Sequence, residues 1–192
     1  ETEGARVLRC VNDDCPAKNA KRIVHFAGKS GINIKGISEK TIEKLIATGI
    51  IRNEVDLLDI ENYKDEILKL DGFKEKSFEN LKKAIDGAKT MTLQRFISAM
   101  AFTGIGYTNA GKIAAALGFD VMKLFDLTPE KINNIEGLGE VLTESFMAEL
   151  SDENMKRRMR EIIKRCKFKE ITRTRNDEVG GKKFVITGNV NI

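Results

Sequence analysis

The sequence predicts a mainly α protein built from repeated helical units. Apolar residues recur three and four positions apart, only two of the 192 residues are proline, and one glycine pattern returns four times. Apolar residues make up 41% and charged residues 32% of the chain, which is typical of a soluble globular protein. No apolar run approaches the roughly 18 residues of a membrane span. Three cysteines argue against a disulfide framework and favour a cytoplasmic location.

The glycine pattern is an apolar residue, any residue, a glycine and a second apolar residue. Its four copies are Ile34-Lys35-Gly36-Ile37, Leu70-Asp71-Gly72-Phe73, Phe102-Thr103-Gly104-Ile105 and Ile135-Glu136-Gly137-Leu138. The glycines are separated by 36, 32 and 33 residues. Near-constant spacing of this kind is the signature of a repeat protein.

Each copy is followed by a stretch with the period of a helix. These stretches are residues 38–49, 74–89, 106–118 and 139–150. In the third, Ala110, Ile113, Ala114 and Leu117 form one apolar face, and Gly118 stands where a C-terminal cap is expected. Helices are also predicted before the copies, from the apolar spacing at 93–100 and from Thr128-Pro129, which is typical of a helix start. Each unit is therefore predicted to be helix, tight glycine turn, helix.

A glycine turn that leads directly into a helix is suited to holding phosphate. The first N–H groups of the helix have no partner inside it, and the helix dipole adds partial positive charge there. Glycine lets a phosphate approach the backbone closely. Such a site positions a nucleic acid without reading its bases. The alternative is that a given copy only packs against its neighbours, as the units of a helical protein-interaction scaffold do.

The charges are segregated along the chain. Residues 155–175 carry ten Lys or Arg and two Glu, whereas residues 54–66 carry six acids and one lysine. This arrangement favours one face that meets a polyanion and another that avoids it. Arg157, Arg158 and Arg160 are candidates for non-specific attraction, and a solvated basic helix is the alternative.

The two ends of the sequence differ from the repeats. Cys10 and Cys15 form a C-x4-C knuckle, which supplies half of the four ligands of a structural zinc site, or is inert. His25 is predicted to be a packed or capping residue rather than a ligand. Near the other end, Phe184-Val185-Ile186 reads as a short strand with no partner in a helical protein. We expect both ends to be pieces of longer domains.

The glycine pattern resembles the helix-hairpin-helix family of nucleic-acid-binding motifs, whose hairpin reads apolar-x-Gly-apolar-Gly. Copies three and four match fully, with Gly106 and Gly139 as second glycines, whereas copies one and two have Ser38 and Lys74 there. The predicted DNA-binding residues are those of the four hairpins with nearby lysines and one hydroxyl: Gly36, Ile37, Ser38, Lys40, Gly72, Phe73, Lys74, Lys76, Gly104, Ile105, Gly106, Thr108, Lys112, Gly137, Leu138 and Gly139.

The order of the segments resembles the C-terminal half of bacterial NAD-dependent DNA ligases. The most specific parts are HF-x7-I-x-G at 25–36, LDGFKEKSFENL at 70–81 and GKKFVITG at 181–188. The resemblance implies the second half of a zinc-finger ribbon at 1–24, four helix-hairpin-helix units at 25–166, a linker at 167–180 and the start of a BRCT domain at 181–192. It also implies that Cys10 and Cys15 are the last two zinc ligands.

The resemblance further implies that the parent enzyme uses NAD and magnesium to seal nicks in replication and repair. Its catalytic lysine lies in a K-x-D-G motif, which Lys69-Leu70-Asp71-Gly72 matches by letter. We reject Lys69 as catalytic because Gly72 is already a hairpin glycine, and we expect catalysis in N-terminal domains of the parent. This chain is therefore expected to bind duplex DNA without base specificity, on both strands across the minor groove. The alternative is a tandem-hairpin module of a repair nuclease or junction-binding protein.

Overall fold

The computed structural model describes residues 16–169, and these residues are mainly helical, as predicted. The first elements are α1 (Pro16–Ala27), α2 (Glu39–Ala47), α3 (Glu54–Leu58), the 3-10 helix η1 (Ile60–Tyr63), α4 (Lys64–Leu68), α5 (Glu75–Ala88) and β1 (Thr90–Met91). They are followed by α6 (Leu93–Ala99), α7 (Tyr107–Ala116), the 3-10 helix η2 (Val121–Asp126), α8 (Pro129–Asn133), α9 (Glu140–Ser151), α10 (Glu153–Ile163) and β2 (Lys167–Phe168). Cys10, Cys15 and the strand predicted at 184–186 lie outside the described residues.

Each of the four glycine patterns lies between two helices. Residues 34–38 (hairpin 1) join α1 to α2, and residues 70–74 (hairpin 2) join α4 to α5. Residues 102–106 (hairpin 3) join α6 to α7, and residues 135–139 (hairpin 4) join α8 to α9. The chain thus contains two consecutive pairs of hairpins: the first pair spans residues 16–88, and the second pair spans residues 93–151.

The sequence explains where the predicted helices begin and end. In α6, Leu93, Phe96 and Ile97 are buried on one face, and Thr92 Oγ1 caps the helix by accepting from Arg95 N–H at 3.3 Å. α7 ends at a left-handed Gly118 with φ +62°. There Gly118 N–H donates to Ala115 O at 3.0 Å and Phe119 N–H to Ala114 O at 2.9 Å. These two bonds form a Schellman motif, which confirms the predicted cap.

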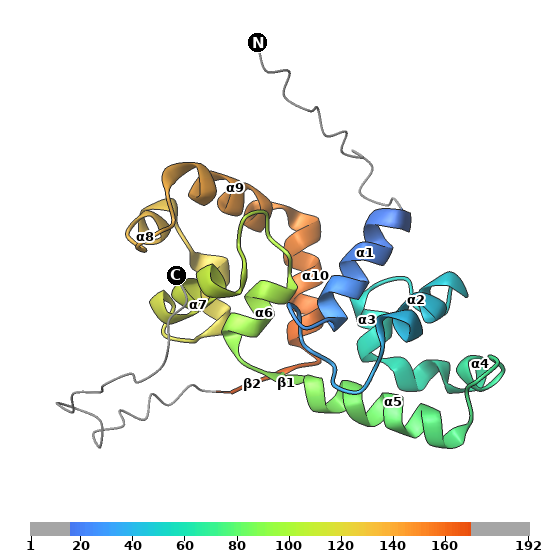
Figure 1. Ribbon diagram of the computed structural model, residues 1–192. Helices are drawn as coiled ribbons and strands as arrows, with labels where there is room; N and C mark the ends of the chain where they lie inside the picture. Colours follow the sequence, from blue (N-terminus) through green and yellow to red (C-terminus); the bar gives the residue numbers. More distant parts are fainter. Residues whose placement is uncertain (1–15, 170–192) are drawn as a thin grey trace, which may run out of the picture.

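The two pairs lie on either side of α10. In Figure 1, α2, α4 and α5 occupy the right of the view and α7, α8 and α9 the left, with α10 between them. α10 contacts α3 of the first pair and α9 of the second, and α1 contacts both α2 and α6. One continuous apolar core runs through these contacts. It includes an edge-to-face pair between Phe102 and Phe146 of the second pair, with ring centroids 4.7 Å apart.

A short parallel strand pairing joins the end of the described chain to the segment between α5 and α6, where the first pair ends and the second begins. β2 pairs with β1 in the register Thr90↔Lys167 and Met91↔Phe168. Phe168 also meets Phe96 of α6 edge to face at 5.4 Å. Lys167 and Phe168, which the sequence analysis places in a linker, therefore belong to the helical body. At the other end, α1 runs through the boundary expected between residues 24 and 25.

Candidate nucleic-acid interface

The hairpin glycines share one backbone conformation. Gly36, Gly72 and Gly137 have φ +82°, and Gly104 has φ +74°. In hairpins 2, 3 and 4, the N–H of the residue after the glycine donates to the carbonyl three residues earlier, in each case at 3.0 Å. A turn closed in this way with positive φ at its third residue is a type II turn, in which glycine avoids the strain of the left-handed region. All four glycines are exposed.

The apolar residue after each glycine shapes the turn. Ile105 and Leu138 are buried, and Ile37 and Phe73 are half-buried and pack against the core. The N–H groups of Phe73, Ile105 and Leu138 are used in closing their turns. These predicted site residues therefore anchor and orient the hairpins, and the donors available to a ligand come from the residues beside them.

The fifth position of each hairpin is the N-cap of the following helix. Ser38, Lys74, Gly106 and Gly139 all have extended backbones, with φ between −131° and −71°. Glycine is therefore not required at this position for its conformation. Its effect is to leave the approach to the helix N-terminus open, since a Cβ placed at Gly106 or Gly139 would meet nothing within 4 Å.

The caps of the first pair use their own polar groups. Ser38 Oγ accepts from Thr41 N–H at 3.1 Å, whereas Lys74 N–H donates to Ser77 Oγ at 2.7 Å. In the second pair, Gly106 and Gly139 make no such cap. Hairpins 3 and 4 thus lead into α7 and α9 with no side chain bound at their N-terminal N–H groups.

The predicted polar residues fall into two groups. Lys40, Lys76 and Thr108 are exposed, and within residues 16–169 they make no side-chain hydrogen bond or ion pair. Lys112 instead donates from Nζ to Glu136 O of hairpin 4 at 2.6 Å. Its ammonium therefore lies beside hairpin 4 rather than beside the hairpin that precedes its own helix.

Sequence reasoning missed Lys44, which stands in the same relation to hairpin 2. Its Nζ donates to Asp71 O and lies over the Phe73 ring, 5.8 Å from the centroid. The signal was present in the sequence, because Lys44 and Lys112 each follow a hairpin glycine, Gly36 or Gly104, by eight residues.

Sequence reasoning also missed Arg95, which links the two pairs. Its Nη1 donates to Lys29 O at 3.1 Å and to Gly31 O at 2.8 Å, in the loop that leads to hairpin 1. Its guanidinium carbon lies 5.2 Å from the centroid of the exposed Tyr107 ring, at the start of α7. No local pattern marks Arg95 because its partners are distant in the sequence.

His25 takes part in the same link, as a packed residue. Its Nε2 donates to Ser98 O at 2.9 Å, and Ser98 Oγ donates to Ser30 O at 2.6 Å. The predicted structural role of His25 is confirmed by this contact. The end of α1 and the loop that leads to hairpin 1 are thus held against α6 of the second pair.

Residues of the acidic segment 54–66 form ion pairs with residues of the basic segment 155–175. Glu54, only 1% exposed, accepts from Arg22 Nε at 3.0 Å and from Arg158 Nη2 at 2.8 Å. Arg165 pairs with Asp59 at 2.7 Å. Burial lowers the pKa of Arg158, and the neighbouring Glu54 opposes that shift. Arg158 is therefore a structural residue that joins α10 to the first pair.

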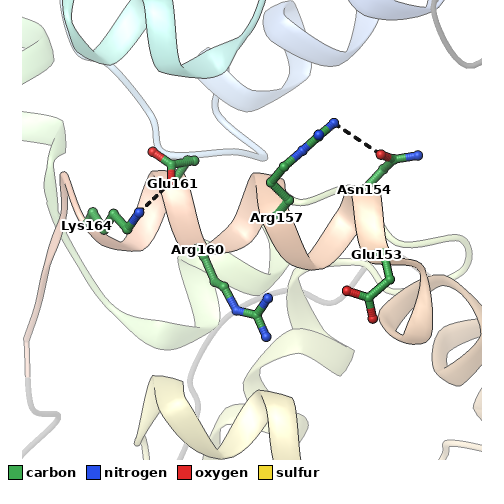
Figure 2. A pocket seen from close by; sticks show the side chains of 6 residues that line it. All are labelled: Glu153, Asn154, Arg157, Arg160, Glu161 and Lys164. Atoms are coloured by element: carbon green, nitrogen blue, oxygen red, sulfur yellow. Dashed lines mark hydrogen bonds and ion pairs between the residues drawn. The ribbon is translucent and has the colours of Figure 1, made fainter.

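The outer face of α10 bounds a shallow hollow of about 350 Å³. Figure 2 shows that two of its basic side chains already have partners: Arg157 donates to the amide oxygen of Asn154 at 3.1 Å, and Lys164 forms an ion pair with Glu161 at 2.6 Å. Arg160 points away from these pairs, and its guanidinium carbon lies 5.1 Å from the Phe125 ring centroid. This face offers weaker candidates for anion binding than the hairpins.

Metal ligands are not assembled in the described part of the chain. No group of three or more His, Cys, Asp or Glu within residues 16–169 could hold a metal ion. Cys166, the one cysteine in this range, is a free thiol whose pKa is raised to about 12 by burial. The predicted ligands Cys10 and Cys15 lie outside the described residues. No helix in the described range is long and apolar enough to cross a membrane.

Comparison with known proteins identifies the relatives of this chain. No family model matches it. It is 35% identical over 191 residues to a DNA ligase of Ruminiclostridium cellulolyticum, which covers 99% of this chain and 29% of that protein. It is 35% identical to a DNA ligase of Lachnoclostridium phytofermentans, over 95% of this chain and 28% of the relative. A DNA ligase of Wolinella succinogenes is 36% identical over 95% of this chain and 27% of its own length.

The chain thus spans less than a third of the length of these relatives. The matches nevertheless cover 95–99% of this chain. By homology over almost its whole length, the chain belongs to the family of bacterial DNA ligases, the family that its motifs resemble.

Proposed function

We propose that this chain is the part of an NAD-dependent DNA ligase that binds the backbone of duplex DNA without reading base sequence. The observation that carries the proposal is the set of four exposed, left-handed hairpin glycines, each directly before a helix N-terminus. Such a turn leads into a helix whose first N–H groups have no partner inside the helix, and the helix dipole favours negative charge there. Phosphates of DNA are anions that recur at fixed spacing along each strand.

The second pair supplies open donors. Gly106 and Gly139 carry no side chain between solvent and the first N–H groups of α7 and α9. Thr108 is exposed in the first turn of α7 and adds a hydroxyl donor. At either hairpin the N–H groups of the protein backbone bind a phosphate. Because every nucleotide carries a phosphate, binding is independent of base sequence.

The first pair supplies charge. Lys40, Lys74 and Lys76 are exposed at the starts of α2 and α5. Each lysine that neutralises a phosphate releases counterions, which makes binding strongly salt-dependent. In the parent enzyme the four hairpins bind nicked duplex DNA beside the catalytic domains. Those domains carry the adenylated lysine and use NAD and magnesium. A zinc ion at Cys10 and Cys15 remains a prediction of the family resemblance.

The test is a fluorescence anisotropy titration of the chain with nicked, intact and single-stranded DNA at about 50 and 200 mM salt. We expect duplex binding whose affinity falls steeply with salt, with a slope of log affinity against log salt concentration of about −0.9 per neutralised phosphate. The double variant G106A/G139A keeps permitted backbone angles and places two methyl groups at the phosphate approach. We expect it to weaken binding about tenfold per hairpin.

Gly87→Ala is the matched control, since Gly87 lies inside α5 with open space around it. This change leaves binding unaltered and slightly stabilises the helix. Absence of duplex binding at 50 mM salt would refute the proposal and favour a protein-interaction scaffold. Equal loss of binding in the control and in G106A/G139A would show that the hairpins are not the contact.

A further inference from the structure

Two lysines make the same contact in the two pairs. Lys44, on the helix after hairpin 1, donates to the carbonyl of Asp71 in hairpin 2. Lys112, on the helix after hairpin 3, donates to the carbonyl of Glu136 in hairpin 4. In both cases the acceptor belongs to the residue just before the left-handed glycine. Each lysine therefore reaches from the first hairpin unit of its pair to the turn of the second.

The contact recurs at alternate hairpins. A lysine lies eight residues after Gly36 and Gly104, whereas the same position after Gly72 is Asn80 and after Gly137 is Ser145. The lysine is thus a feature of the pair rather than of the single hairpin. Because residues in separate pairs satisfy the same rule, the repeating unit of this contact is two hairpins.

We propose that Lys44 and Lys112 are positioning residues that couple the two hairpins of each pair, so that each pair acts as a single phosphate-binding unit. This inference rests on the proposed function. It adds Lys44 to the interface and assigns Lys112 to hairpin 4. It also explains why an exposed lysine is held against a backbone carbonyl.

The physical basis is the orientation of the middle peptide of the turn. Type I and type II turns differ by a flip of this peptide, and only the type II orientation requires positive φ at the next residue. A charged donor on the carbonyl of that peptide favours the orientation in which Gly72 or Gly137 is left-handed. An ammonium has three donors, so two remain for solvent or a phosphate oxygen. It also offsets the carbonyl dipole, which would repel an anion.

Gly137 and Lys112 are in close contact. A Cβ at Gly137 would lie 2.7 Å from Lys112 Nζ, so a side chain there displaces the ammonium. A Cβ at Gly72, which has the same φ of +82° in the first pair, would meet nothing within 4 Å. Gly137→Ala therefore disturbs Lys112 and its turn, whereas Gly72→Ala imposes the same backbone strain outside the second pair. These two glycines provide a matched test.

The experiment is a double-mutant cycle on duplex affinity in the full chain at about 50 mM salt, combining Lys112→Met with Gly137→Ala. We expect each single change to weaken binding about tenfold, and the double variant to be weakened by much less than a hundredfold. Combining Lys112→Met with Gly72→Ala, which lies in the other pair, should be additive. We also expect Lys112→Met to lower the salt slope by more than the roughly 0.9 of one phosphate, because hairpin 4 is lost with the charge.

Lys112→Arg, which keeps the charge and the donors, should bind within about twofold of the unmodified chain, and thermal unfolding of every variant verifies the fold. A multiplicative effect of Lys112→Met and Gly137→Ala overturns the coupling, as does a slope change of 0.9 or less. If either result is found while the unmodified chain binds duplex, the proposed function stands and only the coupling fails. If the unmodified chain binds no duplex, both fail.

Discussion

The first and second pairs present the same turn with different chemistry. Hairpins 1 and 2 end in Ser38 and Lys74, whose polar groups are bonded within their own caps. Hairpins 3 and 4 end in Gly106 and Gly139, which leave the helix starts uncovered. The backbone of the turn depends on the left-handed glycine before them. The cap position is therefore free to vary, and it decides whether a hairpin offers bare N–H groups or side-chain charge.

The two pairs are also fastened to α10 differently. The first pair is joined to α10 by ion pairs as well as by the common apolar core, through Glu54 with Arg158 and Asp59 with Arg165, which lies just after the helix. The second pair precedes α10 directly, through α9, and shares the same apolar core with it. An ion pair depends on each partner being present, whereas apolar contact is distributed over many atoms. The contact of the first pair with α10 should accordingly be the more sensitive to the loss of a single charge.

Removal of the Glu54 charge is expected to have the largest effect. Glu54→Gln leaves Arg22 and Arg158 facing each other, with Arg158 largely buried, and should lower the free energy of unfolding by about 3 kcal/mol. Urea unfolding measures the loss, and hydrogen exchange should locate it in the first pair. The control is Glu61→Gln, which removes an exposed ion pair with Lys82 and should change stability by less than about 0.5 kcal/mol. Uniform loss of protection in both pairs would contradict the difference in fastening.

The charge of the first pair is expected to have the next largest effect, on DNA affinity alone. The double variant K40M/K76M removes two exposed ammonium groups and should lower the salt slope by about 1.8, the value for two phosphates. Both side chains are exposed, so thermal unfolding should be unchanged. Lys83→Met, an exposed change later in the same helix as Lys76, is the matched control. A slope unaffected by K40M/K76M would show that the first pair does not bind through charge.

The cap of hairpin 2 is expected to have the smallest effect. Ser77→Ala removes the oxygen that accepts from Lys74 N–H, which frees this donor while weakening the cap of α5. We expect a loss of stability of about 0.5–1 kcal/mol and DNA binding that is unchanged or about twofold tighter. Paired measurements of unfolding and anisotropy distinguish the two quantities. If Ser77→Ala weakens DNA binding, the bonded cap is the active form, and the contrast between the pairs must be revised.

The sequence predicts local features of this molecule well. The glycine spacing, the apolar period in α6 and the Gly118 cap depend on residues within a few positions of one another, and the structure confirms each of them. The helix boundaries differ by a few residues because terminal turns have few internal bonds. The grouping of the hairpins into two pairs was not predicted, since each copy looks alike when only its own residues are considered.

Long-range contacts could not be predicted from these patterns. The oxygen acceptors that Arg95 and Arg158 bind are 64 to 104 residues away, and nothing near either arginine indicates which acceptor it meets. The sequence therefore predicts a surface for polyanions or a solvated helix in the basic segment, whereas part of this segment neutralises the acidic segment in the structure. The acceptor of Lys44 is a backbone carbonyl, which no residue type reveals, so the only signal for Lys44 in the sequence is its eight-residue spacing from Gly36, the spacing that Lys112 has from Gly104.

The β1–β2 pairing determines where a pull on the end of the described chain would be felt. Lys167 N–H donates to Lys89 O and Lys169 N–H to Met91 O, each at 2.8 Å, so β2 is tied to the stretch that connects α5 to α6. Tension applied beyond Lys169 therefore acts in shear on the β1–β2 hydrogen bonds. The contact between the Phe168 and Phe96 rings resists the same force. The load enters midway between the two pairs and not at the tip of either. A force applied at this end should therefore move both pairs together rather than pull one away from the other.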